Sequence, residues 1–309
     1  MTARAIGAVI RRFGPPEVIR IAPVTVPAPG TGQVRVRVHA AGVGPWDLAI
    51  RSGRTSPPPS LPLVLGAELA GEVESVGPGV DSLDVGDLVF GVSGARFTGA
   101  CAELALADVA TIHPRPALLT SIEAAAVPVA GCTALQMLEL GGTVARRRTL
   151  VLGAAGNVGA WVTRLAARRG AEVVAVVDGP ELAFGRLLEA REVLTSVPAR
   201  TALFDLLLDT VGGAVAGSAL RLLRPGGRLV SSVGRIDLES VDREDVSAEA
   251  CVGDVTSARL ARLSRWIEQG GLPVLLGDVL PLRQAILAHR KLEGLDPKTP
   301  GSLVLRVSE

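Results

Sequence analysis

"LVLGAAGNVGAWVTRLAARRGAEVVAVVDGP", residues 150–180, holds an apolar segment, a glycine-rich turn, a segment with helical spacing and a second apolar segment that ends at Asp178. An apolar run followed by glycines and then by a helical period is typical of a strand, a tight turn and a helix. The stretch therefore predicts a strand–helix–strand unit with parallel strands. Such a unit is typical of a dinucleotide-binding sheet.

The turn itself, AAGNVG at residues 154–159, has the features needed to bind a pyrophosphate. Gly156 lets the backbone approach the phosphates, and Gly159 lets the helix pack close to the strand. The free N–H groups at the start of the helix then face the anion. Ala154 replaces the first glycine of the usual GxGxxG pattern, and the alternative is an ordinary tight turn. The predicted cofactor-binding residues of the turn are Ala155, Gly156, Asn157, Val158 and Gly159.

Strands and helices alternate through the second half of the chain, which predicts a doubly wound parallel sheet. The expected strands are 149–153, 172–177, 204–209 and 227–233, and the expected helices are 158–169, 181–190 and 214–223. A helix over 121–140, with Ser121 as its N-cap, precedes this alternation, and an amphipathic helix over 256–271 follows it. The isolated strand at 301–307 is expected to return to the first domain.

The first 120 residues have a different pattern, rich in valine, glycine and proline. Residues 32–43 alternate apolar and polar side chains, and short apolar segments at 69–80 and 85–92 are broken by turn residues. Several short strands at close spacing predict a compact, barrel-like β domain. Residues 56–60, SPPPS, are expected to form a short stiff loop.

Composition excludes several classes of protein. The formal net charge is +1, which implies neither a nucleic-acid nor an acidic-membrane partner. The N-terminus has no continuous apolar core and no run of 18 apolar residues occurs, so we expect neither a signal peptide nor a membrane span. Cys101, Cys132 and Cys251 are widely spaced and fit a reducing compartment, which predicts a cytoplasmic protein.

Seven stretches together resemble the zinc-independent quinone oxidoreductase family of the medium-chain dehydrogenase/reductase superfamily. They are AAGVGPWDLAIRSG (40–53), LPLVLGAELAGEVESVGPGV (61–80), VGDLVFGV (85–92), VPVAGCTALQML (127–138), GAAGNVGA (153–160), LLLDTVGG (206–213) and LRPGGRLVSSVG (223–234). The resemblance implies an α/β fold, with a GroES-like β-barrel catalytic domain over 1–121, completed by about 280–309, and a Rossmann domain over 122–279.

The resemblance also implies a function. It implies a homodimer that uses NADPH to reduce a quinone or an α,β-unsaturated carbonyl compound, as an enoyl reductase does. It places Gly44, Thr133, Val211 and Gly234 among the residues near the cofactor.

Zinc-containing relatives carry a histidine where this chain has Ala67, together with a cysteine cluster that is missing here. A catalytic zinc ion needs about three protein ligands and an open position. His39, His113 and His289 are scattered along the chain and are expected to be ordinary hydrogen-bonded residues. Glu68 is either a relic of a zinc site or a structural carboxylate. We therefore expect no metal.

Three departures from the family pattern bear on function. Gly44 stands in place of an asparagine near the nicotinamide, which leaves space and removes a hydrogen-bonding group. Cys101 and Leu104 replace tyrosines, and the chain has no tyrosine that can act as an acid. Asp178 ends the second strand, where its carboxylate can accept bonds from the ribose hydroxyls of NADH and repel the 2′-phosphate of NADPH.

The cofactor therefore stays open between NADPH and NADH. Arg186 is the one nearby residue that can offset the repulsion of a 2′-phosphate. The alternative role of Asp178 is to cap the 181–190 helix.

Without zinc or tyrosine, an enolate formed by hydride transfer must be stabilised by backbone N–H groups, a hydroxyl, an arginine or water. The candidates for the catalytic site are Trp46, Asp47, Arg51, Arg96, Phe97 and Thr98. Trp46 and Phe97 either sandwich a flat substrate or pack in the core, and Asp47 either braces the loop or acts as a base. The competing functions are a non-redox tailoring enzyme, such as a cyclase or dehydratase, and a non-catalytic dinucleotide-binding protein.

Overall fold

The computed structural model describes residues 1–94, 96–199, 201–234, 243–270 and 272–308. Contacts divide the chain into two compact units, one made of Met1–Val129 and Val255–Glu309 and the other of Ala130–Asp254. The predicted domains had limits at 121/122 and at about 280. The contact division differs mainly because the helix α7 (Ser257–Glu268) packs on the strand β8 (Ile112–Pro114) and the short helix η2 (Val109–Thr111) of the first unit.

The first unit is built on two sheets, one three-stranded with the order β2-β1-β4 and one seven-stranded with the order β15-β16-β3-β5-β6-β8, where β7 pairs with β3. Its strands are β1 (Ala3–Ile10), β2 (Arg20–Val26), β3 (Gln33–Val43), β4 (Leu63–Val64), β5 (Glu68–Val76), β6 (Leu88–Val92), β7 (Leu104–Asp108), β8 (Ile112–Pro114), β15 (Leu276–Pro281) and β16 (Ser302–Arg306). Its helices are η1 (Pro16–Val18), α1 (Pro45–Ser52), η2 (Val109–Thr111), α2 (Ser121–Ala124), α7, η6 (Leu282–Gln284) and α8 (Ala285–Leu292).

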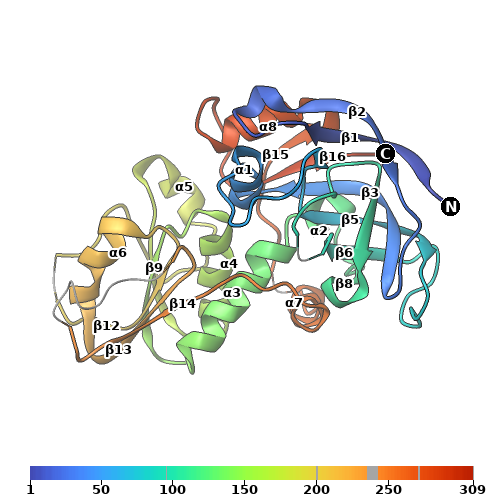
Figure 1. The fold of residues 1–309 in the computed structure, drawn as a ribbon. Coiled ribbons are helices and arrows are strands. Elements are labelled where there is room, and N and C mark those ends of the chain that lie inside the picture. The colour runs from blue at the N-terminus through green and yellow to red at the C-terminus, as the bar shows by residue number, and fades with distance from the viewer. Residues whose placement is uncertain (95, 200, 235–242, 271, 309) are drawn as a thin grey trace. The chain divides into compact units, whose positions relative to one another are not determined.

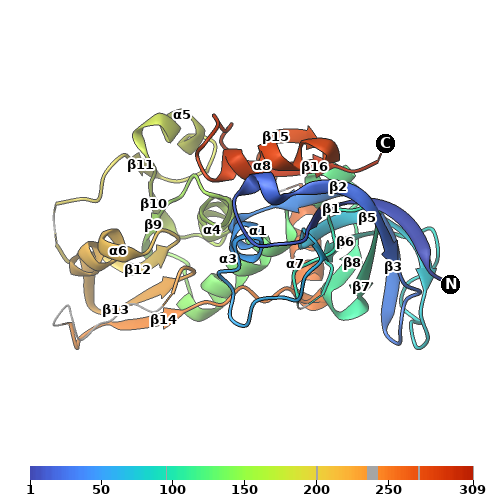
Figure 2. The same ribbon diagram turned by 45° about the horizontal axis from the view of Figure 1, so that its top comes forward.

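The last strand returns to this unit, as the sequence predicts. Strand β16 pairs antiparallel with β3, with Leu303 opposite Val43, and pairs parallel with β15. Figure 2 shows these red strands beside the blue N-terminal strands, and both figures agree on this arrangement. Buried apolar side chains from both ends of the chain, such as Ile10 and Leu305, share one core.

The second unit is a six-stranded parallel sheet with the order β11-β10-β9-β12-β13-β14. Its strands are β9 (Arg148–Leu152), β10 (Glu172–Val176), β11 (Glu192–Leu194), β12 (Phe204–Asp209), β13 (Leu223–Ser231) and β14 (Ser247–Ala250). Its helices are α3 (Pro128–Gly141), α4 (Asn157–Arg168), η3 (Gly179–Glu181), α5 (Leu182–Gly185), α6 (Gly213–Ala219) and η4 (Leu220–Leu222). In Figure 1 α4 and α6 lie on opposite faces of the sheet, which confirms the predicted doubly wound fold.

Two helix predictions were wrong. The 121–140 segment forms two helices, α2 and α3, and Thr120 rather than Ser121 is the N-cap, because its side chain and Glu123 form a capping box. The expected 181–190 helix ends at Gly185. Gly185 packs so closely on strand β11 that an added Cβ would lie 2.8 Å from Cγ1 of Val193, and Glu189 has a positive φ of 59°. Contacts with the neighbouring strand therefore end this helix early.

No helix in the described part of the chain combines the length and the apolar character needed to cross a membrane.

Candidate active site and dinucleotide loop

The glycine-rich turn joins β9 to α4 at the carboxyl end of the sheet in the second unit. Gly156 is the N-cap of α4, and its N–H donates to the carbonyl of Gly153 at 3.0 Å. A Cβ at Gly159 would overlap the carbonyl oxygen of Gly153, so only glycine allows this approach of helix and strand. Gly159 thus makes the close contact between helix and strand that the last glycine of the GxGxxG pattern allows.

The start of α4 is open to an anion. Gly156 is exposed, and no side chain caps the helix. The N–H groups of the first turn, which includes Asn157 and Val158, have no partners within the helix. Free N–H groups and the positive end of the helix dipole together favour a phosphate group. These residues fit the pyrophosphate of a dinucleotide.

A buried carboxylate that the sequence analysis missed fixes the neighbouring loop. Asp209, at the carboxyl end of β12, accepts hydrogen bonds from the backbone N–H groups of Val211, at 3.0 Å, and Gly212, at 2.9 Å, and from Ser231 Oγ at 2.7 Å. Thr210 Oγ1 donates to the carbonyl of Leu152 at 2.8 Å. The signal in the sequence was the aspartate that ends an apolar strand in LLLDTVGG.

Three further cofactor residues expected from the family resemblance, Val211, Thr133 and Gly234, belong to this unit. A Cβ at Gly153 would lie 2.7 Å from Cγ2 of Val211, so Val211 packs against the turn. Thr133 is buried in α3, where a Cβ at Gly253 would lie 2.5 Å from its Oγ1. Gly234 has a φ of 131°, and no heavy atom of the described residues lies within 4 Å of a Cβ at its position.

Asp178 and Arg186 follow the second strand of the sheet, and both are exposed. Asp178 is the N-cap of η3 through its backbone carbonyl, which accepts from the N–H of Glu181 at 2.8 Å. Its side chain makes no capping hydrogen bond. The helix-cap alternative therefore does not occupy the Asp178 carboxylate.

A pocket of about 860 Å³ lies in the first unit. It is lined by Trp46, Ala49, Ile50, Thr55, Pro57, Pro58, Pro59, Ser60, Pro62, Leu63, Arg96, Phe97 and Thr98. Four of the predicted catalytic candidates, Trp46, Arg96, Phe97 and Thr98, are thus brought together. Two others, Asp47 and Arg51, are buried and do not line this pocket. The walls are mostly apolar, and Arg96 is the only charged residue among those that line the pocket.

Trp46 lies directly over Gly44. A Cβ at Gly44 would overlap the six-membered ring of the Trp46 indole. We expected Gly44 to leave space, and instead the indole fills it. Phe97, in the 96–98 segment of the pocket lining, has a positive φ of 55°, and its N–H donates to the carbonyl of Gly94 at 3.1 Å. A tight turn thus holds the second aromatic ring.

Two buried carboxyl groups of the first unit, Asp47 and Glu68, do not line the pocket. Asp47 Oδ2 accepts from the N–H of Gly44 at 2.9 Å, and Glu68 Oε1 accepts from the N–H of Val129 at 2.8 Å. Burial raises the pKa of Asp47 to about 7, and bonds from the N–H groups of Gly44 and Gly66 offset part of this rise. Burial also raises the pKa of Glu68 to about 8, with a smaller contribution from the charge of Asp47. Both groups brace backbone segments, which favours the structural alternative for each.

Arg51 joins two helices of the first unit. Its guanidinium is almost fully buried and forms an ion pair with Glu293, which directly follows α8. His289 on α8 is also buried, and its pKa falls to about 3 because of burial and the positive charge of Arg51. Arg51 therefore holds α1 against α8 and does not reach the pocket.

The other residues singled out by the sequence also have structural surroundings. His39 Nδ1 lies 3.2 Å from Ser121 Oγ, and His113 Nδ1 lies 3.4 Å from Ser257 Oγ. Cys101 packs on Gly66, where a Cβ would lie 2.5 Å from its Sγ, and Leu104 packs in a small buried cluster. Within the described ranges, no group of three or more histidine, cysteine or acidic residues is arranged to hold a metal ion.

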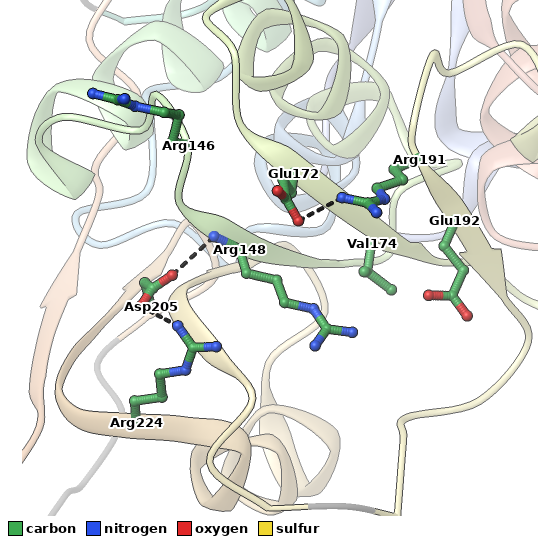
Figure 3. A pocket seen from close by; sticks show the side chains of 8 residues that line it. All are labelled: Arg146, Arg148, Glu172, Val174, Arg191, Glu192, Asp205 and Arg224. Carbon is green, nitrogen blue, oxygen red and sulfur yellow. Dashed lines mark hydrogen bonds and ion pairs between the residues drawn. The ribbon is translucent and has the colours of Figure 1, made fainter.

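A second pocket, of about 490 Å³, lies in the second unit, and Figure 3 shows the side chains that line it. It lies at the amino ends of the parallel strands, whereas the glycine turn follows the carboxyl end of β9. It is lined by Arg146, Arg148, Glu172, Val174, Arg191, Glu192, Asp205 and Arg224. Seven of these eight residues are charged, in contrast with the pocket of the first unit.

The chain is similar to known proteins over nearly its whole length. Residues 30–137 match the alcohol dehydrogenase GroES-like domain, and residues 151–305 match the zinc-binding dehydrogenases. The quinone oxidoreductase of Mus musculus is 31% identical over 320 residues, which covers 95% of each chain. The structure of the quinone oxidoreductase from Coxiella burnetii superposes with a TM-score of 0.89 at 26% identity, over 99% of this chain and all of that one.

A structure described as an NAD-dependent alcohol dehydrogenase superposes almost as well. Its TM-score is 0.87 at 28% identity, over 98% of this chain and 100% of that one.

Proposed function

Since the chain belongs to the quinone oxidoreductase family of the medium-chain dehydrogenase/reductase superfamily, we propose that it transfers hydride from a nicotinamide cofactor to a quinone or an α,β-unsaturated carbonyl compound without a metal ion. Membership of this family makes the protein an oxidoreductase, and members of the family use NADH or NADPH. The substrate, the choice of nucleotide and zinc independence are the proposed parts.

The pocket of the first unit is the observation that carries this proposal. Trp46 and Phe97 give it two aromatic walls, and four prolines make much of the remaining lining apolar. A flat, conjugated ring fits such a pocket, because aromatic and apolar walls with a few polar groups select by shape more than by hydrogen bonding. The volume of about 860 Å³ is large enough for a substituted quinone.

The chain's own contribution to the reaction is orientation and charge stabilisation. When bound, the nicotinamide supplies the hydride, and negative charge then develops on the carbonyl oxygen of the substrate. The Thr98 hydroxyl and the Arg96 guanidinium line the same pocket and are the donors proposed to stabilise that charge. The sequence has no tyrosine, so no phenol takes this part.

We propose NADH as the preferred nucleotide. An Asp178 carboxylate without a capping bond is available to the hydroxyls of the adenosine ribose. The same carboxylate would repel a 2′-phosphate, and Arg186 is the cation proposed to reduce that repulsion for NADPH. The similarity to a structure described as NAD-dependent supports this choice.

We propose zinc independence because the side chains at the expected positions do not supply a set of zinc ligands. Ala67 is buried at the position of the family histidine, and His39 and His113 lie beside serine hydroxyls. Purified protein should therefore contain far less than one equivalent of zinc by elemental analysis and keep its activity with a chelator. One tightly held zinc ion per chain, needed for turnover, would overturn this part of the proposal.

The oligomeric state and the compartment are also proposals. We propose a cytoplasmic homodimer without a nucleic-acid or membrane partner. The three cysteines are buried and form no disulfide within the described ranges, which fits a reducing compartment. Light scattering of the purified protein tests the dimer.

The differences from the family pattern at Gly44, Cys101 and Leu104, which favoured a non-redox tailoring enzyme, are explained by packing. The Trp46 indole covers Gly44, Cys101 packs on Gly66, and Leu104 lies in a buried cluster. These residues therefore do not indicate acid–base chemistry in the pocket, and the oxidoreductase remains the function that the site supports best.

Steady-state oxidation of NADH and NADPH with a panel of simple quinones and enones tests the proposal. We expect turnover with at least one quinone and a higher kcat/KM with NADH. Binding of NADH without oxidation by any member of the panel would contradict the redox assignment and leave a dinucleotide-binding protein.

A further inference from the structure

The charged pocket of the second unit and the glycine turn lie at opposite ends of the parallel strands. Arg148, Glu172 and Glu192 are the first residues of β9, β10 and β11, whereas the glycine turn follows the carboxyl end of β9. The pocket is therefore separate from the dinucleotide loop, and binding of a ligand in it does not depend on the proposed reductase activity.

Four of the seven charged residues in this pocket are already neutralised in pairs. Arg191 Nη1 lies 2.7 Å from Glu172 Oε2, and Arg224 Nη1 lies 2.9 Å from Asp205 Oδ1 (Figure 3). The other oxygen of Asp205 accepts from the backbone N–H of Arg148 at 2.9 Å. The carboxylates of Glu172 and Asp205 are therefore occupied by Arg191, by Arg224 and by the backbone of Arg148, and not by its guanidinium.

The guanidinium of Arg148 is held without a charged partner. It lies 5.1 Å from the centre of the Phe204 ring, and Phe204 is fully buried, so this cation–π contact fixes the side chain. Among the residues that the structure describes, none forms an ion pair or hydrogen bond with this guanidinium. Figure 3 shows it extending into the pocket toward the side on which Glu192 lies.

Glu192 is the matching unpaired group of opposite charge. It begins the edge strand β11, is exposed, and has no ion pair within the described ranges. Strand β10 separates β11 from β9, and Glu192 is in register with Leu150, two residues beyond Arg148. The usual strand spacing and rise therefore set the backbones of Glu192 and Arg148 about 12 Å apart. Because Phe204 holds Arg148 in place, the two charges stay on opposite walls of the cavity.

We propose that this pocket binds a small zwitterion of the amino-acid class, with its carboxylate on Arg148 and its ammonium group on Glu192. A guanidinium presents two parallel N–H groups that match a planar carboxylate. A simple anion would gain the contact with Arg148 but would be repelled by Glu192. A simple amine would gain the contact with Glu192 but would be repelled by Arg148. Arg146, the third charged residue of the pocket outside the two ion pairs, points away from the other side chains in Figure 3. A ligand with both charges neutralises both Arg148 and Glu192, and a volume of about 490 Å³ holds one such molecule.

A titration with matched probes tests this inference on the whole protein. The probes are glycine, 4-aminobutyrate and 6-aminohexanoate, which carry both charges at increasing separation, and butyrate, butylamine and inorganic phosphate. Ligand-detected NMR at one ionic strength gives each dissociation constant. We expect at least one zwitterion to bind about tenfold more tightly than butyrate, butylamine and phosphate. Equal binding of phosphate or butyrate would overturn the proposal in favour of a plain anion site.

Three variants assign the contacts. Arg148→Ala should weaken binding of the best zwitterion at least tenfold, and Glu192→Gln should reduce its affinity to that of butyrate. Arg146→Ala is the matched control, because Arg146 lines the same pocket but points away from the other side chains in Figure 3. An equal loss in Arg146→Ala would show a general effect of charge and overturn the assignment. Glu192→Gln changes an exposed side chain and keeps the test valid if Arg148→Ala fails to fold.

Discussion

The indole ring of Trp46 lies against Gly44, in the space where any other residue would place its Cβ atom. Gly44 is the residue at which the chain departs from the family asparagine, and Trp46 lines the pocket two residues later. The two positions are therefore coupled, because a larger residue at 44 and the present position of the indole exclude each other.

We expect Gly44→Ala to displace the indole. Overpacking of this kind costs about 1–3 kcal/mol of stability, and it should also weaken binding of a quinone to the pocket. Denaturant unfolding and a quinone titration measure the two effects. Gly217→Ala is the matched control, since no heavy atom of the described residues lies within 4 Å of a Cβ there and Ala favours the helix. Unchanged stability and quinone affinity in Gly44→Ala would contradict this packing of Trp46 on Gly44.

Replacement of Gly156 by valine should block the cofactor and leave the fold intact. Gly156 is exposed at the start of α4, and a Cβ there would meet only the carbonyl oxygen of Gly153, at 3.3 Å. A branched side chain would occupy the space that faces the pyrophosphate. We expect the dissociation constants for NADH and NADPH to rise at least tenfold, with little change in melting temperature. Normal cofactor affinity in a folded Gly156→Val protein would defeat the phosphate-loop assignment.

Asp178→Ser should shift the preference between the two nucleotides. Removal of the carboxylate removes its bonds to the ribose and its repulsion of a 2′-phosphate. Because the site is exposed and screened by salt, the expected shift toward NADPH is about 1–3 kcal/mol, or roughly tenfold to a hundredfold in relative affinity. Titration of both nucleotides into both proteins at one ionic strength gives the four constants. A wild type that already prefers NADPH strongly, unchanged by the substitution, would show that Asp178 points elsewhere.

The buried carboxyl of Glu68 should make stability depend on pH. Its folded pKa of about 8 lies above the ordinary value of 4.5, so the folded state holds the proton over this range and the unfolded state does not. The stabilisation is full below about pH 4.5, declines as the pH rises and is gone above about pH 8.

Glu68→Gln removes this titration and keeps an oxygen that can accept from Val129. From pH 5 to pH 9, the free energy of unfolding of the wild type should therefore fall relative to that of the variant, by about 1–4 kcal/mol. Asp81→Asn, which alters an exposed carboxylate, is the control. Parallel stability profiles for wild type and Glu68→Gln would show that Glu68 is ionised in the folded protein throughout.

Arg96→Ala should slow the reduction of quinones. The proposed role of Arg96 is to stabilise negative charge on the substrate oxygen, so its loss should lower kcat/KM about tenfold, less than for a buried donor because Arg96 is exposed. Arg54→Ala is the matched control, since Arg54 is also an exposed arginine of the same unit but does not line the pocket. Equal rates in wild type and Arg96→Ala would remove Arg96 from the proposed site.

The features that local sequence determines were predicted well. The strands around Leu150 and Val174, and the turn with Gly156 and Gly159, depend on apolar runs and on glycines that are visible in a short window. The last strand was also assigned correctly to the first unit, because an isolated apolar segment after a doubly wound domain needs a partner.

The features that depend on distant contacts were missed. Gly185 ends its helix because strand β11 packs against it, and nothing in the sequence of the helix shows that neighbour. One hydrogen bond of Asp209 needs Ser231 on the adjacent strand. The Trp46 ring lies against Gly44 because of the direction in which its side chain points, which the sequence does not show. Arg51 was expected in the pocket, but its partner Glu293 lies 242 residues away in the chain.

The pairing of β16 with β3 also has a consequence for the order in which the protein is made. Residues 130–254 form one uninterrupted unit and leave the ribosome before β16 is synthesised. The first unit, although it contains the N-terminus, lacks one of the two strands that pair with residues 40–42 until then, since these residues pair with both β5 and β16. Domains fold as units during synthesis, usually from the N-terminal end. Here the second unit is the first to have its whole sequence available, and the unit that begins the chain is the last to be completed.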